Sequence, residues 1–155
     1  MTASHPAPAI VARDVAEAVA AVRERGLRVS SARRLLLEAL FAADGPQTAE
    51  ELAAGAGSVS STDPASVYRN LERLEAIGLV RHVHLGHGPG LYALAGSLAD
   101  GYVVCDVCGK RKPATSEQLE RVRRTVRNEF GYESAFSHFP IVGLCPTCAK
   151  AKAAS

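Results

Sequence analysis

The sequence predicts an α+β protein: an N-terminal winged helix-turn-helix domain followed by a small α/β domain with a four-cysteine zinc site. Two observations lead to this expectation. In the first half, helical periodicity is followed by two short alternating segments around a glycine-rich turn. The second half contains all four cysteines, as two Cys-x-x-Cys pairs. We expect the domains to span residues 1–88 and 89–155, with residues 1–9 as a disordered leader.

The first three helices are indicated by periodicity and by end signals. Four valines recur at helical spacing between residues 11 and 22, and Gly26 follows as a stop. Ser30 or Ser31 caps a second helix, which runs from residue 32 to about residue 42. Thr-Ala-Glu-Glu at residues 48–51 matches a capping box and begins a short third helix.

A fourth helix begins at Asp63-Pro64, an N-cap residue followed by proline at the first helical position, and ends before Gly78. One face carries a stripe of apolar residues and is expected to face a core: Val67, Leu71, Leu74 and Ile77. The opposite face offers a different set: Ala65, Tyr68, Arg69, Glu72 and Arg73.

A short helix, a turn and a helix that presents Tyr and Arg form the helix-turn-helix arrangement, whose second helix enters the major groove of DNA. Arginine can donate two hydrogen bonds to guanine, while Ala65 or the Tyr68 ring can contact a thymine methyl group. The alternative is an ordinary amphipathic helix, whose arginines are solvated and paired with Glu72 or Glu75.

The next segment favours DNA binding. Residues 79–85 alternate, residues 86–90 form a turn and residues 91–94 return, which predicts the β-hairpin wing of a winged helix. Arg28, Arg33 and Arg34 flank the start of the second helix, where phosphate contacts commonly arise. Acidic residues slightly outnumber basic ones in this half, so binding depends on segregating charges to different faces.

The cysteine pairs, Cys105/Cys108 and Cys145/Cys148, can together complete the tetrahedral sulfur shell that zinc favours. Gly109 permits a tight reversal after the first pair. Two disulfides or four unrelated thiols are the alternatives. The Ala-rich N-terminus lacks the apolar run of a signal peptide, so we expect a reducing, cytoplasmic location and no persistent disulfides.

The second half is otherwise a short α/β pattern. A strand at residues 102–105 precedes the first cysteine pair. A capping box at Thr115 starts a helix that Gly131 stops, and its apolar face consists of Leu119, Val122, Val126 and Phe130. Two extended segments, residues 132–139 and 140–144, lead to the second pair, and the Ala/Lys tail is expected to fray. No apolar stretch approaches the ~18–20 residues of a membrane span.

The segments LRVSSARRLLLEAL, TAEEL, DPASVYRNLERLEAIGLV, YALA, VVCDVCGK and VGLCPTC occur in the order and spacing of the ferric uptake regulator family. The resemblance covers residues ~25–150. It implies a metal- or redox-responsive repressor without enzymatic activity, small-molecule substrate or membrane association. It also implies a homodimer formed by the second domain, a palindromic double-stranded DNA operator and one structural zinc per subunit.

Carried over by position, the resemblance makes Tyr68 and Arg69 base-reading residues and Arg28 a contact to the adjacent groove. The full set of expected DNA-contacting residues is Arg28, Arg33, Ala65, Tyr68, Arg69 and Arg73. The expected zinc ligands are Cys105, Cys108, Cys145 and Cys148.

The chain departs from the family at the sensory metal site. Residues 99–102 contain no histidine where the family has a His-rich run, and three potential ligands remain nearby: Asp100, Glu120 and His138. His82, His84 and His87 in the wing offer a replacement site for a second, regulatory divalent metal. Alternatively, these histidines contact DNA phosphates or are solvated, and the regulatory site is lost.

Two other classes of protein fit part of the sequence. A rubredoxin-like or thiol-redox metalloprotein would also use four cysteines, but iron would absorb visible light strongly and no catalytic constellation accompanies the thiols. A zinc-ribbon adaptor that binds proteins without binding DNA would leave the face of Tyr68 and Arg69 without a role. Arg69→Ala would then have no effect.

Overall fold

The computed structural model describes residues 7–56, 63–134 and 139–155. The chain forms two compact units, one of residues up to 83 together with 90–98, the other of residues 84–89 and 99–155. The expected boundary at residue 88 falls in the turn of the hairpin. The strand after this turn pairs with the strand before it, so the first unit extends further along the chain than expected.

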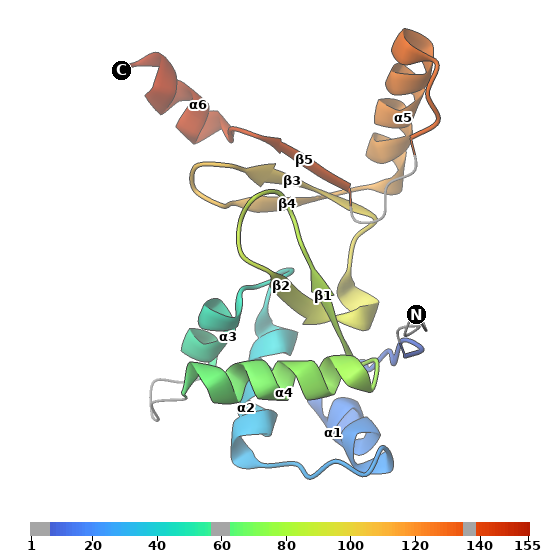
Figure 1. Ribbon diagram of the computed structural model, residues 1–155, viewed down its shortest axis with the longest axis vertical. Coiled ribbons are helices and arrows are strands. Elements are labelled where there is room, and N and C mark those ends of the chain that lie inside the picture. The colour runs from blue at the N-terminus through green and yellow to red at the C-terminus, as the bar shows by residue number, and fades with distance from the viewer. Residues whose placement is uncertain (1–6, 57–62, 135–138) are drawn as a thin grey trace, which may run out of the picture. The chain divides into compact units, whose positions relative to one another are not determined.

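Four helices build the first unit (Figure 1): α1 (Val15–Glu24), α2 (Ser31–Ala42), α3 (Ala49–Gly55) and α4 (Pro64–Ala76). Successive pairs of these helices pack together. Leu37, Leu52, Leu71 and Leu74 are among the largest fully buried side chains of their shared core. The stripe expected on the fourth helix is therefore its core-facing side.

The predicted helix ends are confirmed. The Ser30 hydroxyl accepts a hydrogen bond from the backbone N–H of Arg33, so Ser30 is the N-cap of α2. Thr48 and Glu51 form a complete capping box at the start of α3. Asp63 caps α4, with proline in its first turn. These side chains satisfy backbone N–H groups that no preceding helical turn can reach.

The chain before α1 differs from the expectation. α1 begins at Val15 after the N-cap Asp14, and Val11, expected in the helix, precedes it and is exposed. Residues 7–9, expected in a disordered leader, lie against the end of α4. A Cβ added to Gly78 would lie 2.1 Å from the Pro8 carbonyl oxygen, and Gly78 has φ +92°. Glycine is thus required there both for the backbone conformation and for this close approach.

The hairpin consists of β1 (Val80–Val83) and β2 (Leu91–Leu94), which pair antiparallel as predicted. The segment before α3 also pairs with β2, because Gln47 and Tyr92 exchange backbone hydrogen bonds of 3.0 and 2.7 Å. Since only one residue of that segment pairs, the sequence shows no alternating pattern that would predict a strand there. A short 3₁₀ turn, η1 (Ala95–Ser97), ends the unit.

The second unit is a three-stranded sheet, with β3 (Gly101–Cys105) between β4 (Arg111–Ala114) and β5 (Phe139–Gly143). β3 is antiparallel to β4 and parallel to β5. β4 was not expected from the sequence, because it contains Pro113. Proline lacks a backbone N–H, and an edge strand such as β4 tolerates it.

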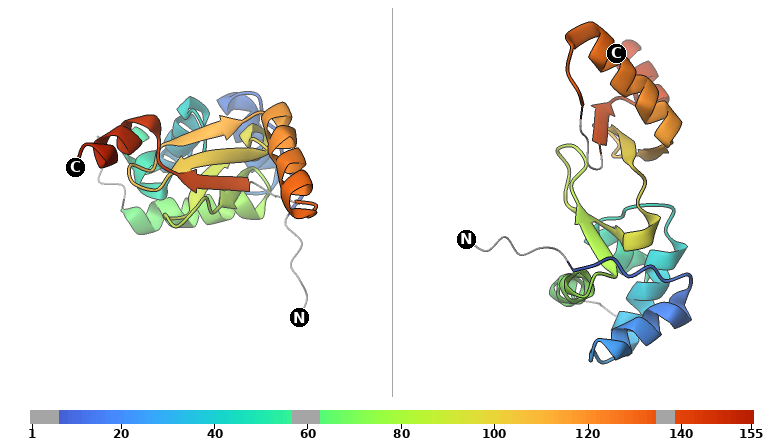
Figure 2. Two further views of the ribbon diagram at one scale, coloured as in Figure 1. Left: turned by 90° about the horizontal axis from the view of Figure 1, so that it is seen from above. Right: turned by 90° about the vertical axis from the view of Figure 1, so that its right-hand side faces the viewer.

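Two helices complete this unit: α5 (Ser116–Phe130) and α6 (Pro146–Ala153). In Figures 1 and 2, α5 (orange) and α6 (red) extend from opposite ends of the sheet. The Thr115 capping box and the stop at Gly131 are confirmed. Leu119 is buried, but Phe130 at the far end of the same face is 70% exposed. Val122 and Val126 between them are partly exposed, so the α5 apolar face is covered less towards its end.

The C-terminal tail is helical, and the expectation of fraying was wrong. Cys145 acts as the N-cap of α6, and proline occupies the first helical position. The alanines and lysines that follow have high helix propensity. None of the helices formed by the described residues combines the length and apolar character needed to cross a bilayer.

Truncating Leu71 should destabilise the first unit. Leu71 is completely buried, so Leu71→Ala leaves a cavity that we expect to cost about 2–5 kcal/mol of unfolding free energy. Urea unfolding of the zinc-loaded protein measures this cost. Its exposed neighbour Glu72, changed to Ala, should shift stability by no more than about 0.5 kcal/mol. Equal costs for the two variants would contradict the core assignment.

Candidate zinc centre and DNA-contacting surface

The four cysteines converge at one end of the second unit's sheet. Cys105 ends β3 and Cys145 follows β5, and because these strands are parallel neighbours their ends lie together. Cys108 lies in the turn after β3, and Cys148 in the first turn of α6. Among the described residues, this is the one group of three or more His, Cys, Asp or Glu with ligand atoms close enough to share a metal.

The sulfur positions match a tetrahedral zinc site. All four Sγ atoms lie within 4.8 Å of one another, and those of Cys108 and Cys145 are 3.8 Å apart. Four sulfurs bonded to zinc at 2.3 Å are separated by about 3.8 Å. The cysteines are free, so the disulfide alternative is not realised. The residues present therefore fit a structural zinc.

Backbone hydrogen bonds fix the loop that carries the first pair. The N–H of Gly109 donates to the carbonyl of Cys105 at 2.9 Å, and the N–H of Cys105 donates to the carbonyl of Lys110 at 2.9 Å. Gly109 has φ +72°, the left-handed conformation this reversal requires. The N–H of Asp106 donates to the carbonyl of Gly143, which ties the loop to β5.

The same backbone favours the thiolate forms of Cys105 and Cys145. The pKa of Cys105 is lowered to about 6, because backbone N–H groups of Cys108 and then Cys145 donate to its sulfur. The pKa of Cys145 is also lowered, chiefly by the N–H of Cys148. The pKa of Cys148 is raised to about 12, because its thiol donates a hydrogen bond to the sulfur of Cys145. Zinc would take the place of the remaining thiol protons.

α4 presents most of the residues expected to contact DNA. Ala65, Tyr68, Arg69 and Arg73 are exposed, on the side opposite the buried leucines. The Tyr68 hydroxyl donates to Glu50 Oε1 of α3 at 3.3 Å, and its ring meets that of Tyr92 edge-on, with centroids 6.5 Å apart. Tyr68 is thus held in place although 39% of it is exposed.

The two arginines expected to contact DNA near the start of α2 differ in their exposure to solvent. Arg28 is exposed, as a DNA contact requires, whereas Arg33 is only 5% exposed. The Arg33 side chain donates to Asn70 and to the carbonyl of Arg28. Its place in the sequence suggested a phosphate contact, but the structure turns it inward. Charge and position in the sequence cannot distinguish these orientations.

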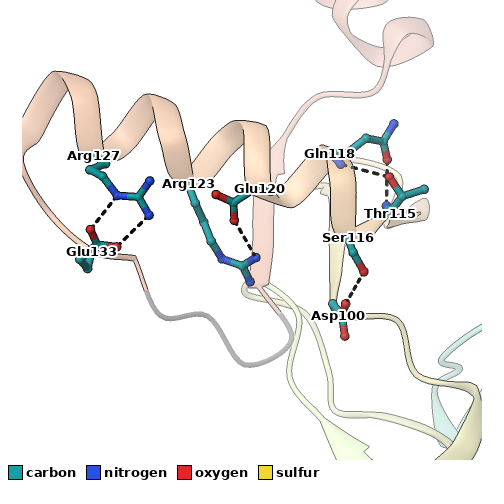
Figure 3. Close-up of polar contacts among 8 residues, drawn as sticks. All are labelled: Asp100, Thr115, Ser116, Gln118, Glu120, Arg123, Arg127 and Glu133. Atoms are coloured by element: carbon teal, nitrogen blue, oxygen red, sulfur yellow. Dashed lines mark hydrogen bonds and ion pairs between the residues drawn. The ribbon is translucent and has the colours of Figure 1, made fainter.

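Among the described residues, those suggested for a second metal do not form a group with ligand atoms close enough to share an ion. His82 stacks on Tyr92 with ring centroids 4.5 Å apart, and His84 and His87 follow it in the chain. Asp100 accepts a hydrogen bond of 2.8 Å from Ser116, and Glu120 lies 3.9 Å from Arg123 (Figure 3). His138 lies outside the described residues. A second metal in this region stays a prediction.

Comparison with known proteins identifies the family of this chain. The model of the ferric uptake regulator family matches residues 24–139. The chain belongs to this family. It is therefore a transcription regulator and not an enzyme, and the rubredoxin-like and redox-enzyme alternatives are excluded.

Among curated relatives, the ferric uptake regulation protein of Campylobacter upsaliensis is 28% identical over 130 residues, which cover 82% of this chain and 83% of that protein. The peroxide operon regulator of Bacillus subtilis is 27% identical over 143 residues, covering 91% and 97%. The structure of the Helicobacter pylori ferric uptake regulator superposes with a TM-score of 0.67 at 19% identity, covering 87% of this chain and 91% of that one. The last comparison confirms the fold.

Replacing Cys105 with serine should abolish zinc binding. A serine hydroxyl is not a soft ligand, and the three sulfurs left cannot complete the shell. We expect elemental analysis to find one zinc per subunit in the wild type and none in Cys105→Ser, with loss of helical signal from the second unit. Val107, 71% exposed in the same loop, supplies the control Val107→Ala, which should keep its zinc. A folded, zinc-loaded Cys105→Ser would refute the site.

Removing Arg123 should strengthen any cation binding at Glu120. The guanidinium of Arg123 competes with an added cation for this carboxylate, across an exposed pair worth about 0.2–1 kcal/mol. We expect Arg123→Ala to bind Co²⁺ up to about fivefold more tightly than wild type in equilibrium dialysis of zinc-loaded protein. Arg124→Ala is the control. No difference between the two variants would show that Glu120 is not a ligand.

Proposed function

We propose that the protein is a homodimeric repressor that binds a palindromic DNA operator through α4 and depends on one structural zinc per subunit. The observation that carries this proposal is the exposed set of Tyr68, Arg69 and Arg73 on a helix whose other face is buried. A winged-helix domain places such a helix in the major groove. Arg28, which precedes α2, is exposed and can supply a further contact to DNA.

The second unit supplies the surface for the dimer. Val103 on β3 and Val142 on β5 are exposed at about two fifths, and Phe130 and Tyr132 at the end of α5 are exposed at about seven tenths. β5 is also an edge strand of its sheet. Exposed apolar side chains beside a strand edge favour association with a second chain. A twofold dimer presents two copies of α4 to two half-sites.

The regulatory signal is a metal or an oxidant, as it is for relatives named as ferric uptake and peroxide regulators. We propose that the signal changes the arrangement of the two winged helices in the dimer, so that both fit successive major grooves in one state only. If a divalent metal is the signal, it must compete with Ser116 for Asp100 and with Arg123 for Glu120. The free thiols and the family membership support a cytoplasmic location.

Arg69→Ala and Tyr68→Ala should each weaken operator binding by about 1–3 kcal/mol, because each removes a contact to base edges. The operator can be selected from a random-sequence DNA library with zinc-loaded wild type, and binding measured by fluorescence anisotropy. Arg23, exposed in the last turn of α1, gives the matched control Arg23→Ala, which should bind as wild type. Unchanged affinity in both α4 variants would refute the recognition helix and favour the protein-binding adaptor.

A further inference from the structure

Arg33 is the charged side chain most deeply buried among the described residues. It occupies the third position of α2, where its backbone N–H donates to the Ser30 hydroxyl at 3.2 Å. Its pKa is lowered, first by burial and then by the nearby positive charge of Arg73. A guanidinium placed here does not act as a solvated surface charge.

The guanidinium joins two separate segments. Its Nε donates to Asn70 Oδ1 on α4 at 3.1 Å, and its Nη1 donates to the backbone carbonyl of Arg28 before α2. The orientation of the Asn70 amide is itself set, because its Nδ2 donates to the carbonyl of Ser66 one turn earlier at 3.0 Å. Asn70 therefore directs its oxygen towards Arg33.

Both segments carry exposed residues expected to contact DNA. Arg28 supplies the carbonyl that Arg33 holds, and Asn70 directly follows Arg69. Both acceptors are neutral, so the hydrogen bonds do not offset the cost of burying a charge as a carboxylate would. What this arrangement supplies is geometry: the planar fork of arginine binds two acceptors at fixed directions, which the single ammonium of lysine cannot do.

We propose that Arg33 is a positioning residue for DNA recognition, which sets α4 relative to the Arg28 segment so that both reach the DNA in one fixed arrangement. The inference rests on the proposed function. Arg33 acts through Asn70 and through the backbone of Arg28, and does not itself contact DNA. Its loss should therefore reduce discrimination between sequences, while the number of phosphate contacts stays the same.

The test compares Arg33→Lys and Asn70→Ala with the control Arg23→Lys. Arg33→Lys keeps the charge, and Asn70→Ala breaks the same contact from α4 without altering charge. Arg23 is exposed in the last turn of α1 and does not belong to the set expected to contact DNA. Each zinc-loaded, dimeric protein is titrated with the selected duplex and with a scrambled duplex of the same length, over a series of salt concentrations.

We expect both variants to bind the selected duplex about tenfold more weakly, with affinity for the scrambled duplex changed by less than about twofold. The slope of log affinity against log salt should be unchanged, because it reports phosphate contacts. The double variant, Arg33→Lys with Asn70→Ala, should bind the selected duplex no more than about twofold more weakly than the weaker-binding single variant. Each single change already removes the hydrogen bond between Arg33 and Asn70, so the two losses should not add. Arg23→Lys should behave as wild type.

Three results would overturn the proposal: unchanged binding of the selected duplex, equal losses on both duplexes, or fully additive losses in the double variant. If Arg33→Lys does not form a zinc-loaded dimer, Asn70→Ala alone decides between the same outcomes. Failure of wild type to enrich any sequence from the library would refute the proposed function itself. That result is distinct from any failure of Arg33, because it appears before a variant is compared.

Discussion

The convergence of four sulfur atoms at one end of the β3–β5 pair is the constraint on which the second unit depends. The described residues of this unit include few large buried side chains, chiefly Leu85, Tyr102, Val104 and Leu119. A core of this size rarely stabilises a small domain by itself, and a structural metal is one of the usual supplements. Zinc would link the end of β3, the turn after it and the start of α6. Metal binding is therefore expected to contribute strongly to the folding of this unit.

The first unit needs no such support. Its helices and its hairpin enclose one continuous core of leucines and valines. The surface expected to meet DNA lies on the other side of α4 from that core, so the packing that stabilises the unit also orients Tyr68 and Arg69 outward. The buried guanidinium of Arg33 adds a polar link between α2 and α4. Stability and recognition are thus divided between the two faces of one helix.

The exposed surfaces of the two units suit different contacts. The apolar side chains that the second unit leaves exposed, such as Val103 and Phe130, suit a permanent contact with another chain. The exposed arginines of the first unit suit a reversible contact with DNA that salt can weaken. Between β2 and β3 the chain has only a short 3₁₀ turn and a few residues, with Asp100 held by Ser116 at the start of the second unit.

Features that depend on near neighbours in the chain could be predicted from the sequence alone. Helix caps at Ser30, Thr48 and Thr115, the stripe on α4 and the two cysteine pairs were all predictable, because each involves residues within a few positions. Features that depend on distant neighbours could not be predicted in this way. In the folded chain β4 pairs with β3, Arg33 is buried while Arg28 is exposed, and His82 stacks on Tyr92. The direction of a side chain depends on which distant acceptor or ring lies beside it, and that partner comes into place only when the chain folds.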